Sequence, residues 1–241
     1  MSTPSMRSPR VEAMLDALFA HGDRGDEYWD DLSVLATEAN ASTIVRPFVV
    51  ARCRAALERA DASCIVRVLD VLSEMNEPVA RFAVPFARHA SEAVRCAVAS
   101  ALEDSRDPRA IAALVSLCRD ASPRVSATAL DAIVRGLGVP GEHDFVDTPA
   151  VRDAIASCLE DATPVGRAVA ILGLAMRRDG RALAPLATAL WNDELTGDLV
   201  DAAYYLAAPE LRDALQHHLA SGSTTCGEWS LGDALAACTF E

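Results

Sequence analysis

The sequence predicts an all-α protein, a right-handed α–α superhelix of about five to seven helical pairs, judged from its length and repeat period. Three observations support this fold class. The 241 residues are 51% hydrophobic but only 5% aromatic, so alanine, leucine and valine dominate, which favours closely packed helices over a β-sandwich. Apolar residues recur at helical spacing. The same helix-start pattern returns several times.

The helix-start pattern consists of an acidic residue, an alanine, a hydroxyl residue and a proline, as in DASP from Asp120 and DATP from Asp161. The hydroxyl can accept a hydrogen bond from an amide of the first turn. Proline suits the first helical position, where no intrahelical amide bond is lost. Copies anchored on Ser91, Ser122 and Thr163 lie 31 and 41 residues apart, and another begins at Asp193.

The elements follow in order. Helices are expected over residues 8–22, 26–39, 42–60 and 61–75, the last facing inward through Cys64, Val68, Leu69, Val71 and Leu72. Helices over 107–120 and 179–193 precede the copies from Ser122 and Asp193, and a short helix begins at residue 231. Prolines inside first-helix patterns require a bend or break, at Pro47, Pro85 and Pro185. The organisation is N-terminal capping helices over 1–60, repeats over 61–219 and a C-terminal capping segment over 220–241.

From Asp61 to Leu219 the chain resembles the HEAT-like repeat family, in particular the bacterial repeats of the phycobilisome-lyase type. That family often has Val-Arg early in the second helix, matched by Arg95 and Arg167, and an aspartate in the preceding turn, matched by Asp120, Asp161 and Asp193. Three positions depart from it, namely Ser126, Leu199 and His89, so we expect no unbroken Asp–Arg ladder. The resemblance implies stacked helical pairs whose second helices line a concave face.

Composition excludes several classes of function. A net charge of −13 opposes sequence-independent binding to nucleic acid. All 22 basic residues are arginine, which rules out a P-loop lysine and Schiff-base chemistry and suits a GC-rich bacterial genome. No apolar run approaches the length of a membrane span. The odd number of cysteines, seven, without a C-x-x-C pair, indicates free thiols and a cytoplasmic location.

Two regions are candidate contact surfaces. The long 41-residue spacing indicates an extra loop over residues 136–149, and such a loop either is plain surface or contacts a partner. The outward positions of the second helices are more apolar than an exposed face requires. Either they bind a partner or the C-terminal cap covers Val169, Leu172 and Tyr204. The predicted partner-binding residues are Asp131, Arg135, Glu142, His143, Phe145, Val169, Leu172, Met176, Asp201 and Tyr204.

No catalytic constellation is recognisable in the sequence, so we assign no catalytic, cofactor-binding or metal-binding residue and expect no cofactor. The predicted function is that of a non-enzymatic scaffold or adaptor that binds a protein or peptide on the concave face, with neither nucleic acid nor membrane as partner. Two alternatives remain open. One is a lyase or isomerase that acts on a bound chromophore or protein, and the other is an inhibitor or immunity protein for a basic partner.

Overall fold

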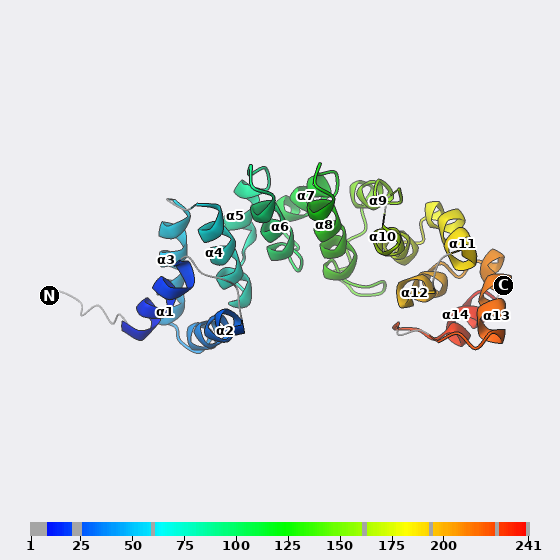
Figure 1. The fold of residues 1–241 in the computed structure, drawn as a ribbon, viewed down its shortest axis with the longest axis horizontal. Coiled ribbons are helices and arrows are strands. Elements are labelled where there is room, and N and C mark those ends of the chain that lie inside the picture. The colour runs from blue at the N-terminus through cyan, green and yellow to red at the C-terminus, as the bar shows by residue number, and fades with distance from the viewer. Residues whose placement is uncertain are drawn as a thin grey trace. The chain divides into compact units, whose positions relative to one another are not determined.

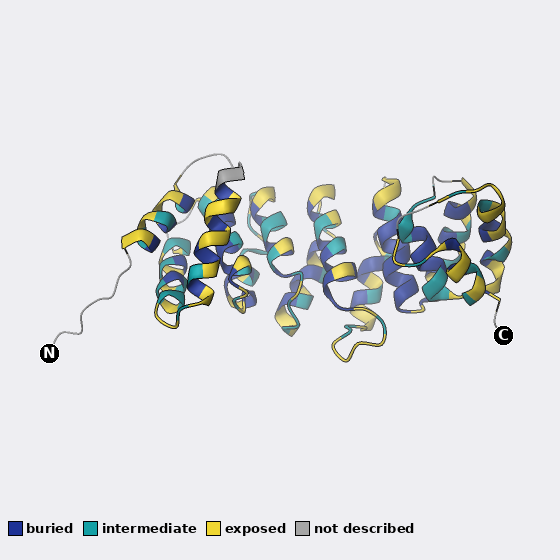
Figure 2. Cartoon of the chain, turned by 90° about the horizontal axis from the view of Figure 1, so that it is seen from below, coloured by how far each residue is buried: buried dark blue, intermediate teal, exposed yellow. Residues whose placement is uncertain are grey.

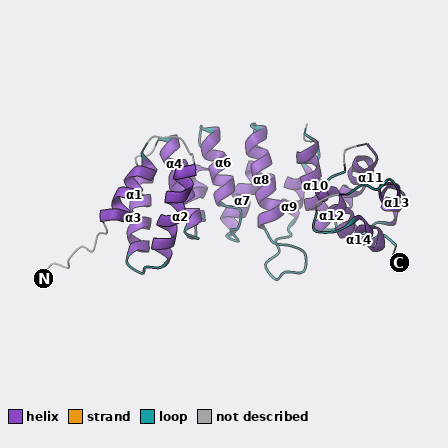
Figure 3. Ribbon diagram, turned by 60° about the horizontal axis from the view of Figure 1, so that its bottom comes forward, coloured by secondary structure: helices purple, strands orange, loops and turns teal. Residues whose placement is uncertain are grey.

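The computed structural model describes residues 9–20, 26–58, 61–160, 163–192, 195–224 and 227–239. Within these ranges the regular structure is helical and there is no β-strand (Figure 3), which confirms the predicted fold class. The α-helices are α1 Pro9–Phe19, α2 Asp26–Asn40, α3 Val45–Leu57, α4 Ala62–Glu74, α5 Ala80–Ala83, α6 Glu92–Ala101, α7 Pro108–Leu117, α8 Pro123–Gly136, α9 Pro149–Ala156, α10 Pro164–Met176, α11 Leu183–Asn192, α12 Gly197–Leu206, α13 Arg212–Ala220 and α14 Leu231–Ala237. Short 3-10 helices are η1 Val84–Phe86, η2 Gly180–Ala182 and η3 Pro209–Leu211.

The helices pack into two compact units, one over residues 1–110 and the other over residues 111–241 (Figure 1). In the first unit α1 packs on α2, α3 on α4 and α5 on α6, and α4 stacks on α6. In the second unit α9, α11 and α13 each pack on the helix that follows, and α8, α10, α12 and α14 stack in turn. The second helices of neighbouring pairs therefore form a continuous row within each unit, as expected for stacked helical repeats.

The helix-start pattern behaves as predicted at two of its copies. Ser122 Oγ accepts from the amide of Val125 at 3.5 Å, and Thr163 Oγ1 accepts from that of Gly166 at 3.1 Å. Pro123 and Pro164 occupy the first turns of α8 and α10. The Asp120 carboxylate accepts from the amide of Ser122 at 2.9 Å, so this acid orders the turn before the helix.

The pattern also has exceptions. Ser91 stands at the start of α6, but its side chain accepts no first-turn amide. The cap of α12 is Thr196, three residues after the predicted start at Asp193, and Asp161 and Asp193 lie outside the described residues. Thr148 and Pro149 repeat the pattern at α9, where the sequence analysis had not identified it.

The three prolines do not all break a helix. Pro47 lies in the first turn of α3, where its missing amide removes no hydrogen bond. Pro85 lies in η1 and ends α5 after a single turn, as predicted. Pro185 lies in the first turn of α11, directly after the switch from the 3-10 helix η2. Of these three prolines, Pro85 and Pro185 accompany an interruption of the first-helix pattern, at η1 and at the η2–α11 boundary.

Helix α10 forms the centre of the second unit, and its residues from Ala168 to Met176 are all buried. Figure 2 shows buried residues along the interfaces between neighbouring helices. Gly173 lets α10 approach α8 and α9, because a Cβ atom there would lie 2.5 Å from Val134 Cγ2 and 3.3 Å from two atoms of Ile155. A helix that is apolar on every side needs neighbours on every side, and α8, α9, α11 and α12 provide them.

The described cysteines are free thiols, as predicted. Cys53 is buried, and burial raises its pKa to about 12. Cys118 and Cys158 are buried beside each other, and a hydrogen bond from Cys158 together with burial raises the pKa of Cys118. Cys64 was predicted to face inward but is half-buried, because the inward face of α4 is shifted toward Ile65.

Candidate functional site

Two adjoining depressions lie in the second unit, around α12. The first has a volume of about 450 Å³, and Pro140, Arg178, Tyr204 and Trp229 are among the residues that line it. The second has a volume of about 390 Å³, and Arg135, Leu172, Asp198, Asp201 and Glu228 are among those that line it. Met176 and Tyr205 line both depressions, so we treat the two as one surface and call it the α12 groove.

A segment far along the chain builds one wall of the α12 groove. The Asp201 carboxylate on α12 accepts hydrogen bonds from the amides of Glu228, at 3.1 Å, and Trp229, at 2.9 Å. A Cβ atom at Gly227 would lie 2.7 Å from Asp201 Oδ1 and 3.0 Å from Gly197 Cα, so only glycine allows this close approach. Asp201 is therefore a structural anchor for residues 227–230.

Aromatic side chains complete that wall. The Trp229 ring stacks on the Tyr204 ring with centroids 3.7 Å apart and planes 12° apart. Tyr205 Oη donates to Glu228 Oε2 at 3.0 Å. Burial and the neighbouring Glu228 raise the pKa of Tyr205, so its phenol stays a neutral donor. Ser230 caps α14 in a capping box with Asp233, which fixes the end of the segment.

The charges of the α12 groove are unevenly matched. Arg135 Nε donates to Asp131 Oδ1 at 2.8 Å, and Arg135 Nη2 lies 3.2 Å from Asp198 Oδ2. Asp201 and Glu228 are bonded to neutral donors, namely backbone amides and a phenol. Among the described residues that line the second depression, three carboxylates therefore stand beside one guanidinium.

The structure corrects the predicted apolar contact face. Val169, Leu172 and Met176 are only 6%, 5% and 7% exposed, because α8 and α12 cover the faces of α10 that the repeat register had assigned to the outside. Leu172 and Met176 still reach the floor of the α12 groove, whereas Val169 lines neither depression. Trp229 of the predicted C-terminal capping segment stacks on Tyr204, which is half-buried and lines the first depression.

The predicted extra loop is present, as residues 137–148 between α8 and α9. The Arg177 guanidinium lies over the ring of Phe145, with its Cζ atom 4.8 Å from the ring centroid. Glu142 Oε2 accepts a hydrogen bond from the amide of Val139 at 3.1 Å. His143 is exposed. Val139 and Pro140 of this loop line the α12 groove, so the loop contributes to the site through residues that the sequence analysis had not selected.

Arg177 fastens the loop to α10. It is almost fully buried, and burial lowers its pKa to about 10. Its guanidinium donates to Gly173 O at 2.9 Å and to Val146 O at 3.0 Å. The base of the loop is closed by a further bond, from the amide of Val146 to Leu137 O at 3.0 Å. The loop therefore stands on a fixed base.

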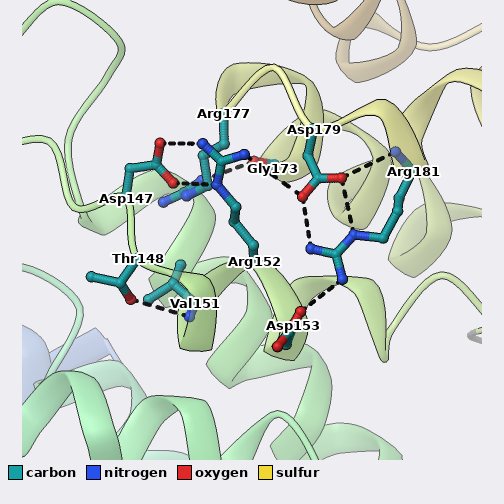
Figure 4. A network of polar contacts seen from close by, with 9 residues as sticks. All are labelled: Asp147, Thr148, Val151, Arg152, Asp153, Gly173, Arg177, Asp179 and Arg181. Carbon is teal, nitrogen blue, oxygen red and sulfur yellow. Dashed lines mark hydrogen bonds and ion pairs between the residues drawn. The ribbon is translucent and has the colours of Figure 1, made fainter.

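An arginine–aspartate network beside the loop links α9 to η2 (Figure 4). Arg152 forms a bidentate pair with Asp147, at 2.7 and 2.6 Å, and lies 3.8 Å from Asp179. Arg181 forms a second bidentate pair with Asp179, at 2.9 and 2.7 Å, and reaches Asp153 at 2.8 Å. Hydrogen bonds from these arginines lower the pKa of Asp147 and of Asp179.

This network differs from the ladder that the resemblance suggested. At the family's arginine position in α8, Ser126 Oγ donates to Cys118 O at 2.7 Å, so a hydroxyl replaces the charge. Arg95 donates to His89 O at 2.9 Å and to Ala90 O at 3.1 Å instead of to an aspartate in that turn. In the network of Figure 4, Asp179 and Arg181 belong to an Asp-x-Arg-Ala pattern that the sequence repeats at the starts of the helices predicted over 107–120 and 179–193, whereas Asp147, Arg152 and Asp153 belong to no predicted repeat pattern.

Two functional classes can be compared with the described part of the chain. No group of three or more histidine, cysteine, aspartate or glutamate side chains in those ranges is placed to hold a metal ion. None of the helices described there has the length and apolar character needed to cross a membrane.

Comparisons with known proteins agree with the fold. Residues 50–134 match the family model of the HEAT repeats. The structure is similar to the X-ray structure of YibA from Escherichia coli, with a TM-score of 0.61 and 19% sequence identity over 99% of this chain and 97% of that chain. No curated protein is a significant match to the sequence. The similarity to YibA shows a shared fold alone.

Proposed function

Because residues 50–134 are HEAT repeats and the described chain has a HEAT-like fold throughout, we propose that it is a non-enzymatic scaffold that binds a segment of a partner protein. Repeats of this kind typically mediate protein interactions through the surface formed by successive helices. We propose that the contact lies on the side of the second helices, at the α12 groove. We also propose a cytoplasmic location, because free cysteines such as those of the described residues persist there.

The observation that carries this proposal is the composition of the α12 groove. Its floor and walls combine a methionine, three aromatic rings and several carboxylates in two neighbouring hollows. Tyrosine, tryptophan and methionine are enriched at protein interfaces. The two aromatic residues offer a large contact area at a small entropic cost, and methionine adapts to irregular surfaces. Two side chains of one extended segment can occupy two adjoining hollows of this size.

The inhibitor alternative uses the same surface. An inhibitor of a basic partner requires accessible carboxylates next to apolar side chains, and the second depression contains both, in the half-buried Asp198 and the exposed Glu228 beside Leu172. The scaffold and the inhibitor therefore share one prediction, that binding depends on the α12 groove.

Site-specific photo-crosslinking tests the proposal. A photoreactive phenylalanine analogue replaces Arg178 in the groove or, as a control, the exposed Gln216 of α13, which lines neither depression. Irradiation in the native host should join the chain to one partner from position 178 and not from position 216. The same partner should be lost from Tyr205→Ala and kept by Trp191→Ala, whose side chain is 55% exposed outside the groove. Equal capture by both photoreactive variants would rule out the groove as the contact.

A further inference from the structure

We infer that the segment bound in the α12 groove is cationic, with an arginine side chain that enters the second depression between Asp198 and Glu228. This inference rests on the proposed function and adds the chemical class of the partner. It follows from the balance of charge at the second depression, from the apolar and aromatic floor beneath it, and from the charge of the chain as a whole.

The carboxylates of the second depression are only partly neutralised by cationic groups. Asp198 on α12 shares the guanidinium of Arg135, at 3.2 Å, with Asp131, which lies on α8 together with Arg135. Glu228 is exposed and accepts one hydrogen bond from a neutral phenol, at 3.0 Å. Asp201 accepts two bonds from backbone amides, which carry no net charge. Three carboxylates and one guanidinium line the second depression, so it has an excess of negative charge that a second cation would reduce.

The floor of the second depression is apolar. Leu172 and Met176 form apolar surface below the carboxylates, and the ring of Tyr205 stands between the two depressions. A long basic side chain covers apolar surface with its methylene stem while its charged end reaches the acids. A guanidinium can in addition stack on an aromatic face and form a bidentate pair of hydrogen bonds with a carboxylate. This combination favours arginine over lysine.

The charge of the whole chain limits which kind of molecule the α12 groove can bind. The chain has a net charge of −13, so a second copy of it or a nucleic acid would bring like charge to an acidic surface. A basic segment of another protein brings the opposite charge. The chemistry of the groove therefore points to a cationic peptide segment.

Arg135 is the one basic side chain among the described residues that line the second depression. Its side chain is 46% exposed, and its guanidinium already neutralises part of the charge of Asp198. An entering guanidinium competes with it. Removing the charge of Arg135 should therefore strengthen binding, a gain that general damage to the fold cannot imitate.

The test uses peptides selected on the full chain. A phage library of random dodecapeptides is selected on the immobilised protein, and the enriched peptides are synthesised with a fluorescein label, each also with citrulline in place of arginine. Citrulline keeps the shape of arginine and removes its charge. Affinities are measured by fluorescence anisotropy at low and high salt for the wild type and for Asp198→Asn, Glu228→Gln, Arg135→Gln, Tyr205→Ala and the control Asp213→Asn, an exposed acid on α13.

We expect the enriched peptides to be basic and to lose about tenfold in affinity with citrulline or at high salt. Asp198→Asn and Glu228→Gln should each weaken binding by about three- to tenfold, and Asp213→Asn by less than about twofold. Arg135→Gln should tighten binding by about threefold.

The outcomes separate the two proposals. Binders that are neutral or acidic, or that bind equally well as citrulline peptides, overturn the cationic inference. If those binders still depend on Tyr205, the groove remains a binding site and the proposed function stands. If no enriched peptide depends on Tyr205, the proposed function itself fails.

Discussion

Replacing Gly173 with alanine tests how tightly α10 is packed. The added Cβ atom would lie 2.5 Å from Val134 Cγ2, whereas ordinary contact between carbon atoms is about 3.5–4.0 Å, so one of the two helices must move by about 1 Å. Val134 is buried and β-branched, and a β-branched side chain in a helix has one strongly preferred rotamer, so it cannot turn away.

The magnitude follows from two opposing contributions. Overpacking of a filled core costs about 1–3 kcal/mol, and alanine recovers about 1 kcal/mol of helix propensity relative to glycine. We therefore expect Gly173→Ala to lower the free energy of unfolding by up to about 2 kcal/mol. Gly180→Ala is the matched control, because no atom lies within 4 Å of its Cβ position, and it should cause no loss.

Urea unfolding followed by tryptophan fluorescence and circular dichroism measures both variants. Trp191 and Trp229 both lie in the second unit, so the fluorescence signal reports mainly on the unit that contains Gly173. In a Val134→Ala background the clash disappears, and Gly173→Ala should become neutral or stabilising. A loss of the same size in both backgrounds, or equal stability of Gly173→Ala and Gly180→Ala, would refute the packing argument.

Three further predictions concern other parts of the chain. Asp201→Ala should release residues 227–230 at a cost of roughly 1–3 kcal/mol and speed hydrogen exchange at the amide of Trp229; unchanged exchange there would contradict its anchoring role. The hydrogen bond from Arg181 holds the pKa of Asp179 below its ordinary value of 3.8, so the contribution of Asp179 to stability should be complete above about pH 5 and lost as the pH falls below 3.8 and through the lower pKa of the folded state. Asp179→Asn should flatten that acid limb of thermal unfolding, and an unaltered limb would argue against it. In the folded protein an alkylating reagent should label the half-buried Cys96 before the buried Cys53, whose pKa is raised to about 12, and mass spectrometry showing the reverse order would exclude this account.

Local chemistry made the helix starts predictable from the sequence. A hydroxyl that accepts a first-turn amide and a proline at the first position act within a few residues, so Ser122 and Thr163 mark the starts of α8 and α10. The extra loop was equally accessible, since a repeat of fixed length reveals an insertion by its spacing. The family match over residues 50–134 agrees with the repeat that the periodicity indicated.

The candidate site was less predictable, because it depends on contacts between distant residues. The repeat register predicted an outward position for Leu172 and Met176, since a helix that is apolar all round does not reveal which neighbours cover it. The anchoring of Trp229 by Asp201 joins residues 28 positions apart, and no local pattern predicts such a bond. The sequence contains only weak signals of this contact, namely Gly227 and Trp229 within a turn-rich stretch.

Because the base of the loop over residues 137–148 is closed, the fold does not depend on the length of this loop. The bond from the amide of Val146 to Leu137 O and the bond from Arg177 to Val146 O hold the two ends together whatever lies between them. Lengthening a loop with fixed ends costs little, about 0.6 kcal/mol for each doubling. The tip around His143 is thus a natural insertion point, where a new recognition sequence could be added beside the α12 groove without redesigning any helix.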